Sequence, residues 1–336
     1  MISKPTVLIL GAGASAPYGF PTGKKLVEDV LKFNASGSHI WSLSLSEIKK
    51  ELNIYDGPDL KDFKNSLKLS GRNSVDAFLE SRPEFLIVGK ALIAYFIFIY
   101  EFDSKEQIFN TNDDNLYRYL VEFLYKYAKN YTEFKKNKLS ILTFNYDRSL
   151  EYFLYNAIRN NYSSKSDPIG SPLESIPIVH LHGSLGSLND VDFGSEKMSI
   201  NMNEMVNPKD KKNIKDNIKK AVENIIVIHE NENIDKYPQF EKARKLIDEA
   251  QRIYFLGFGY DPINMKRLGL QKLITHKLYF GSAYGLTEKE KDEIKRSHKN
   301  DYHPALNTFD LTLGESGHKC VEFLRTVEPL GPEILR

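Results

Sequence analysis

The residues best suited to chemistry stand directly after apolar segments. Asn145 follows one such segment, and His182 follows another with Gly183 next to it. An amide has donor and acceptor atoms to satisfy, and a histidine titrates near neutral pH. A glycine beside the histidine admits close approach of a ligand. We interpret Asn145 as a hydrogen-bonding group of a site and His182 as a candidate general base.

Two neighbouring residues have simpler interpretations. Asp147 is either a ligand-binding carboxylate or only the N-cap of a helix that starts near residue 148. His180 alternates with His182 along an expected strand, and we interpret it as structural. No further His, Cys, Asp or Glu stands at ligand spacing from this pair, so we expect no metal site.

A glycine-rich turn follows the first apolar segment. Thr6–Leu10 is expected to be a buried parallel strand, and Gly11, Gly13 and Ala16 then give the G-x-G-x-x-G/A spacing of a dinucleotide-binding turn. Unpaired N–H groups at the start of a following helix would face phosphate oxygens. The alternative is a strand-to-helix turn that binds nothing.

The segment after this turn departs from the usual pattern. Pro17, Gly19 and Pro21 interrupt any helix, so the regular helix is expected to start near Thr22 as N-cap. Gly23-Lys24-Lys25 lacks the hydroxyl of a Walker loop. A loop over the dinucleotide site would grip substrate or exclude water.

Strands and helices alternate along the chain, which predicts an α/β, Rossmann-like, doubly wound parallel sheet of about six strands. Expected strands are Thr6–Leu10, Leu139–Phe144, Ile176–Leu181, Ile225–Ile228, Arg252–Leu256, Lys277–Phe280 and Leu306–Phe309. Expected helices cover 22–34, 43–53, 59–69, 74–103, 112–136, 148–160, 239–250, 263–272, 287–298 and 316–327. Polar or glycine-rich clusters follow several strands, so we expect them to converge on one crevice.

We interpret residues 1–336 as a single catalytic domain. Residues 36–136 form an expected helical insertion between the first and second core strands, and 187–224 form a second insertion that is mobile or helical. The apolar run 85–102 contains Lys90, and we expect a buried helix rather than a membrane span.

Composition excludes several classes of protein. The net charge of +1 gives no long-range attraction to nucleic acid or anionic lipid, so neither is expected to bind directly. The single cysteine, Cys320, excludes a disulfide framework and an all-cysteine zinc site. The chain begins without a signal-peptide pattern, and a cytoplasmic protein is expected.

Several motifs together resemble a known family. The segments Gly11-Ala12-Gly13-Ala14-Ser15, Phe20-Pro21-Thr22-Gly23, Phe144-Asn145-Tyr146-Asp147, His182-Gly183-Ser184 and Gly257-Phe258-Gly259-Tyr260-Asp261 occur in sirtuin order. In this combination the chain resembles the bacterial sirtuin-like domains of anti-phage defence systems, over roughly residues 5–285. The segment 74–80, Ser-Val-Asp-Ala-Phe-Leu-Glu, also looks like a helix of those proteins.

The resemblance implies NAD as ligand and substrate, with no zinc and no further cofactor. By motif matching, pyrophosphate would lie on Gly11, Ala12, Gly13 and Ser15, and the nicotinamide side on Pro21 and Thr22. Asn145 would lie by the nicotinamide ribose, Asp147 by the carboxamide, and His182 would be the general base. The adenosine half would lie by Gly257, Gly259, Asp261 and Ser282.

Departures from the family narrow the activity. Deacetylating sirtuins carry a four-cysteine zinc module and an Ile-Pro-Asp-Phe-Arg segment, and this chain has one cysteine and Phe20-Pro21-Thr22-Gly23. The resemblance therefore implies hydrolysis of NAD to ADP-ribose and nicotinamide, as the NAD-depleting effector of abortive infection. The alternatives are a non-enzymatic NAD or ADP-ribose sensor and a protein ADP-ribosyltransferase.

Cleavage of the nicotinamide–ribose bond develops positive charge on the ribose, so it needs an oriented leaving group and a positioned water. We expect Asn145 to orient ribose and water, and His182 to accept a proton. Unregulated NAD loss would kill the host, so we expect a resting state released by a partner or by homo-oligomerisation. Family context suggests an ATPase, an Argonaute-like protein or a phage component as the partner.

Overall fold

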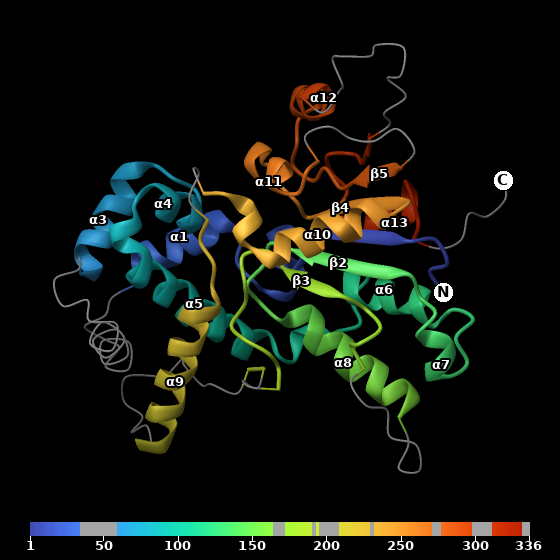
Figure 1. The fold of residues 1–336 in the computed structure, drawn as a ribbon, viewed down its shortest axis with the longest axis horizontal. Coiled ribbons are helices and arrows are strands. Elements are labelled where there is room, and N and C mark those ends of the chain that lie inside the picture. Colours follow the sequence, from blue (N-terminus) through green and yellow to red (C-terminus); the bar gives the residue numbers. More distant parts are fainter. Residues whose placement is uncertain are drawn as a thin grey trace.

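Parallel strands form one sheet through the centre of the protein (Figure 1). The computed structural model describes residues 1–33, 59–163, 172–189, 193–194, 208–228, 232–270, 277–297 and 311–330. Its strands are β1 (Thr6–Leu10), β2 (Leu139–Thr143), β3 (Ile178–His180), β4 (Arg252–Leu256), β5 (Leu278–Gly281) and β6 (Leu311–Leu313). The order β3-β2-β1-β4-β5-β6 and the parallel pairing confirm the predicted Rossmann-like α/β sheet.

The strand order places a switch point between β1 and β4. From β1 the chain first builds the sheet outward through β2 and β3, and it then returns to add β4 on the other side of β1. Leu10 pairs with Leu256 at the carboxyl ends of these two strands. Ligands of doubly wound sheets bind in the crevice at this point, so the residues after Leu10 and Leu256 are the first to consider.

Alternating side chains of the strands bury both faces of the sheet. On β1, Leu8 and Leu10 join one apolar core, whereas Val7 and Ile9 join another. The first core includes residues of α6 (Leu116–Tyr125), α8 (Ser149–Tyr162) and α13 (Cys320–Thr326). The second includes residues of α10 (Pro238–Glu249) and α11 (Pro262–Arg267). Helices on both faces make the sheet doubly wound.

A separate helical layer lies beside the sheet (Figure 1). It consists of α1 (Gly23–Lys32), α3 (Leu60–Ser70), α4 (Val75–Ser81), α5 (Leu86–Ser104) and α9 (Pro208–Asn224), and it has its own apolar core. Lys90 of α5 donates a hydrogen bond of 3.0 Å to the carbonyl oxygen of Val222 in α9. The described chain between β1 and β2 is helical, and its interpretation as an insertion stays a prediction.

The remaining helices are short or peripheral. They are α7 (Tyr131–Phe134), α12 (Glu288–Ser297) and the 3-10 turns η1 (Ala12–Ala14), η2 (Ala16–Tyr18), η4 (Pro83–Phe85), η5 (Gln107–Phe109) and η6 (Ile234–Lys236). The predicted helix 74–103 is wrong as one helix, because Pro83 has no N–H and separates α4 from α5. The predicted helix 112–136 is likewise divided near Tyr127, whose φ is +67°.

The prediction of a strand at Ile225–Ile228 is wrong. This segment is largely buried but belongs to no strand of the described sheet, and Ile226 N–H donates to the carbonyl oxygen of His182, after the end of β3, at 2.9 Å. The last strand is Leu311–Leu313, whereas the predicted strand Leu306–Phe309 lies outside the described residues. The predicted helix 43–53 and much of the predicted insertion 187–224 also lie outside them, although α9 occupies its C-terminal part.

Among the described residues, the helical segment Pro83–Ser104 is long and apolar enough to cross a membrane, and 61% of its most apolar window is buried inside the protein. Its residues pack in the core of the helical layer, and Glu101 near its end is fully buried against Arg148. Packing in the core of the helical layer therefore accounts for the apolar composition of this segment.

A buried lysine closes the C-terminal end of α10. Lys277 donates from Nζ to the carbonyl oxygens of Ile247, Asp248 and Ala250 at 2.8, 2.6 and 2.9 Å. Of these carbonyls, that of Ile247 also accepts from the backbone N–H of Ala250 at 3.2 Å. Carbonyls at the end of a helix lack the usual intrahelical donors, and a cation there also meets the negative end of the helix dipole. Burial lowers the pKa of Lys277. The ammonium therefore joins the start of β5 to the end of α10.

We expect Lys277→Met to destabilise the protein by about 2–3 kcal/mol, because buried carbonyls lose a charged donor while the aliphatic stem is kept. Chemical denaturation followed by circular dichroism measures the change. Lys245→Met, on an exposed position of the same helix, is the matched control and should change stability by less than about 0.5 kcal/mol. Equal stability of the two variants would contradict this role for Lys277.

Candidate functional site

The turns after β1 and β4 meet backbone to backbone. Gly11 N–H donates to the carbonyl oxygen of Leu256 at 3.1 Å, and Gly13 N–H donates to that of Gly257 at 3.0 Å. A Cβ on Gly13 would lie 2.8 Å from the Cα of Gly257, and one on Gly257 would lie 2.1 Å from the N of Ala14. Gly257 also has a φ of +59°. Both turns therefore require glycine for this approach.

The chain after Gly11 forms the 3-10 turns η1 and η2 in place of a regular helix. The expected interruption is confirmed, since α1 starts at Gly23 and Thr22 Oγ1 caps it by accepting from Lys25 N at 3.4 Å. The helix whose N-terminus was expected beyond the turn is α1, and η1 and η2 separate it from Gly11. Within these turns, the N–H groups of Gly13, Ala14 and Ser15 already donate to the carbonyl oxygens of Gly257, Gly11 and Ala12.

A cavity of about 570 Å³ opens beside this junction. The predicted residues that line it are Ala12, Gly13, Thr22, Gly257, Gly259 and Ser282. Lys319 is the single charged residue of the described lining, and its Nζ lies 2.8 Å from Asp114 Oδ2. The volume lies in the range of small-molecule sites, about 300–1,000 Å³. Segments around residues 12, 257 and 282 thus meet at one site.

Asn145 is fixed against the glycine turn. Its Nδ2 donates to the carbonyl oxygen of Gly11 and to Ser15 Oγ, both at 3.2 Å, and its backbone N–H donates to Thr143 Oγ1 at 3.1 Å. A carbonyl oxygen can only accept, so the amide orientation is settled. Among the described residues, no group donates to Asn145 Oδ1, and this oxygen remains free to accept from a ligand.

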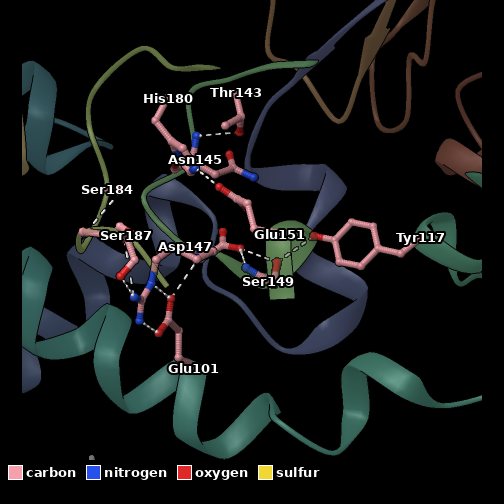
Figure 2. A network of polar contacts seen from close by, with 12 residues as sticks. Glu101, Tyr117, Thr143, Asn145, Asp147, Ser149, Glu151, His180, Ser184 and Ser187 are labelled. Atoms are coloured by element: carbon pink, nitrogen blue, oxygen red, sulfur yellow. Dashed lines mark hydrogen bonds and ion pairs between the residues drawn. The ribbon is translucent and has the colours of Figure 1, made fainter. Parts of the chain in front are cut away.

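Asp147 is buried in a different network, which Figure 2 shows. Its Oδ1 accepts from the backbone N–H of Ser149 at 3.2 Å and from the Ser149 hydroxyl, and Ser149 Oγ lies 2.7 Å from Tyr117 OH. Burial raises the pKa of Asp147. Asp147 does not line the described cavity, and the N-cap of α8 is Arg148 rather than Asp147, which lies one position before it and accepts from Ser149.

Arg148, which lies between Asp147 and α8, forms a buried ion pair with Glu101 of α5. Glu101 of α5 accepts from the Arg148 backbone N–H at 3.1 Å and from its Nη2 at 2.6 Å (Figure 2). Glu101 is 0% and Arg148 1% exposed. Because the carboxylate bonds both backbone and guanidinium, it ties the turn that follows β2 to the helical layer.

His182 lies beside the residues that flank Asn145. Its ring centroid is 5.4 Å from that of Phe144 and 6.3 Å from that of Tyr146. The side chain is 8% exposed, and Nε2 has no hydrogen-bond partner among the described residues. Burial lowers its pKa, so the ring is neutral near pH 7. No hydrogen bond joins His182 to Asn145 in the described chain.

His180 makes structural contacts, as its interpretation requires. Its Nδ1 lies 2.8 Å from the carbonyl oxygen of Asn145, and its Nε2 contacts Glu151 of α8 (Figure 2). The strand ends at His180, so alternation does not carry on to His182. The two histidines therefore have different surroundings, with His180 on Glu151 and His182 on Phe144 and Tyr146.

The other predicted residues divide into two groups. Ser282 Oγ accepts from Gly257 N–H at 2.9 Å, which places it at the β4 turn inside the cavity lining. Asp261 is exposed and caps α11 by accepting from Ile263 N and Asn264 N. The predicted residues Gly11, Ser15, Pro21, Asn145, Asp147, Asp261 and His182 do not line the described cavity.

The site also contains residues that motif matching passed over. Asp76 and Glu80 lie one turn apart on α4; Asp76 accepts from Tyr146 OH, and Glu80 pairs with Arg267 Nη1 at 3.1 Å. Asp76 raises and Arg267 lowers the pKa of His182, against the larger effect of burial. The spacing of four residues between two acids in 74–80 was a signal that could have found them.

Comparisons with known proteins add no relative. No protein-family model matches the chain, and no curated protein is detectably similar to it. In the part of the chain that the structure describes, no group of three or more His, Cys, Asp or Glu could hold a metal ion. The resemblance to sirtuin-like domains therefore stays a prediction from the motifs alone.

We expect Gly257→Ala to destabilise the protein by about 3 kcal/mol or more, because its Cβ would meet the Ala14 backbone at a positive φ. Thermal and chemical unfolding measure the loss. Gly259→Ala is the matched control, since no described atom lies within 4 Å of its Cβ, and a change below about 1 kcal/mol is expected. If both variants unfold alike, the close approach at Gly257 is not a constraint.

Proposed function

We propose that this protein hydrolyses the nicotinamide–ribose bond of NAD, releasing nicotinamide and ADP-ribose. The observation that carries the proposal is the placement of Asn145. Its amide is fixed on Gly11 and Ser15 at the switch point of a doubly wound sheet, and no group of the described residues donates to its Oδ1. A glycine-lined cavity of about 570 Å³ lies at the same turn. Sheets of this kind bind dinucleotides at this place.

His182 supports a proton transfer in the same region. Because burial lowers the pKa of His182, its ring is neutral near pH 7, and Nε2, which has no hydrogen-bond partner among the described residues, has a lone pair available to accept a proton. Its ring packs on Phe144 and Tyr146, on either side of Asn145 in the chain. The Asn145 amide thus belongs to the short segment after β2, and the His182 ring packs against the neighbours of Asn145 in that segment.

The proposed reaction divides the work between these two groups. As the C1′–N bond breaks, its electron pair leaves with the neutral nicotinamide, and positive charge develops on the ribose. Asn145 Oδ1 accepts from a ribose hydroxyl or from the attacking water. The water oxygen bonds to C1′, and its proton passes to His182, which accounts for the single proton released by hydrolysis.

We further propose that the activity depletes NAD in defence against phage, under the control of a partner or of self-assembly. An ATPase, an Argonaute-like protein or a phage component are the partners that the motif resemblance suggests. Control of the activity is needed because a constitutive NAD hydrolase would be toxic to its own cell.

We expect Asn145→Ala and His182→Ala each to reduce nicotinamide release by at least about 10²-fold, as loss of a general base or of a substrate-orienting group does. Release from NAD is measured by chromatography on protein activated in the same way as wild type. Gln239→Ala, which loses a hydrogen bond to Leu181 O, is a nearby control outside the proposed machinery.

Labelled NAD separates the alternatives in the same assay. Free ADP-ribose supports hydrolysis, label on protein indicates an ADP-ribosyltransferase, and tight binding without release indicates a sensor. Wild-type rates in a folded His182→Ala variant would overturn the assignment of His182.

We expect the acid limb of the pH–rate profile to lie below pH 6.5. The lowered pKa of His182 keeps the ring in its neutral, basic form until the pH falls below the usual value, and activity is lost only there. Asp76 raises this pKa, so Asp76→Asn should move the limb to still lower pH. An acid limb above pH 6.5 in the wild type would contradict His182 as the base.

A further inference from the structure

The carbonyl oxygen of Asn145 is held by a histidine outside the proposed machinery. His180 Nδ1 lies 2.8 Å from this oxygen, and His180 Nε2 contacts Glu151 Oε1. Figure 2 shows the ring between the turn after β2 and the side chain from α8. The side chains of His180 and Glu151 are 13% and 15% exposed, so water screens the contact little.

The partners of the ring decide its protonation. A carbonyl oxygen cannot donate, so Nδ1 must carry a proton to bond Asn145. A carboxylate is also an acceptor, so Nε2 must carry a second proton to bond Glu151. Both bonds are therefore made together only by the imidazolium. A neutral ring with its proton on Nδ1 would turn a lone pair toward the carboxylate.

The electrostatic surroundings agree with this assignment. Glu151 and Asp147 raise the pKa of His180 to about 8, although burial opposes them. The same ring lowers the pKa of Glu151. The cavity next to the ring is also lined by Arg148 at the start of α8, Glu174 before β3 and Lys242 of α10. Contact with Glu151, the hydrogen bond to the Asn145 carbonyl and the nearby charge of Asp147 together outweigh the effect of burial.

We propose that His180 is a positioning residue, which as an imidazolium clamped by Glu151 holds the Asn145 backbone so that the amide lies on Gly11 and Ser15. The inference rests on the proposed function for its effect on catalysis, but the clamp itself does not. Asn145 is then held at three points: by Thr143 at its N–H, by His180 at its carbonyl and by the glycine turn at its side chain.

The clamp has a definite pH dependence. The pKa of His180 is raised above the ordinary 6.5 to about 8, so the stabilisation is complete below pH 6.5 and is lost as the pH rises through about 8. Above that pH the Nε2 lone pair faces Glu151 and the ring no longer bonds both partners. The alkaline limb of nicotinamide release is therefore expected near pH 8.

Two variants test the clamp. Glu151→Gln keeps an acceptor for Nε2 but removes the charge, so the pKa of His180 should fall by about one unit or more. Glu174→Gln is the matched control, because this exposed carboxylate lines the same cavity without bonding the ring. It should leave the pKa of His180 within about 0.3 units of wild type.

The decisive measurement is an NMR titration of histidine-labelled protein, with His180→Ala to assign the ring signal. In wild type we expect the ring of His180 and the backbone amide of Asn145 to titrate together near pH 8. In Glu151→Gln both should titrate at lower pH, and the alkaline limb of kcat should move by the same amount.

The outcomes separate this inference from the proposed function. A wild-type His180 that titrates at or below 6.5, or an Asn145 signal that ignores it, overturns the clamp. An alkaline limb that stays in place in Glu151→Gln while the ring pKa falls overturns its role in catalysis. If NAD is never cleaved while the two signals titrate together near pH 8, the proposed function fails and the clamp stands.

Discussion

The contact between the turns after β1 and β4 is the constraint on which the candidate site depends. Two hydrogen bonds, from Gly11 N to Leu256 O and from Gly13 N to Gly257 O, extend the pairing of the strands beyond their ends. The approach leaves no room for Cβ atoms, and both the cavity and the carbonyl oxygen that receives the Asn145 amide follow from it. A site built on backbone atoms is rigid and carries little charge of its own.

The turn after β2 is fixed by a different means. Asn145, Asp147 and Arg148 each bond an element far away in the chain: the glycine turn, α6 through Ser149, and α5 through Glu101. These bonds involve buried charged or amide groups, which are costly to leave unpaired. The network therefore sets the direction of each side chain after β2. Residues next to one another in the sequence thus bond to different parts of the protein.

The sequence predicted the sheet well because its signals are local. Short apolar segments that end in glycine or polar residues marked five of the strands to within two or three residues, and Thr22 was found from capping chemistry. Ile225–Ile228 is as apolar as a strand, but its side chains pack in apolar cores after α9 without joining the sheet. Composition alone cannot distinguish a buried strand from a buried segment of this kind. Pro83 divided a predicted helix whose apolar pattern continues across it.

The site was predictable only in part, for the same reason. Glycine spacing indicated Gly13 and Ala16, which line the cavity, whereas Asn145 and His182, indicated by strand ends, do not line it and their roles stay predictions. The pairing of Asp76 with Tyr146, of Glu101 with Arg148 and of Glu151 with His180 depends on which helix faces which turn. Separations of 70, 47 and 29 residues leave no periodic trace in the chain.

The end of α9 bears on how sequences of this kind can diverge. Ile226 N–H bonds the carbonyl oxygen of His182, and the carbonyl oxygen of Asn224 occupies the space where Gly183 would carry a Cβ, at 1.9 Å. Because the join is made by main-chain atoms, substitutions at 224 and 226 are compatible with it. An insertion or deletion between α9 and residue 226 is not, because it would shift every carbonyl against the histidine turn. Among related sequences, we therefore expect the length of this segment to vary less than its side chains.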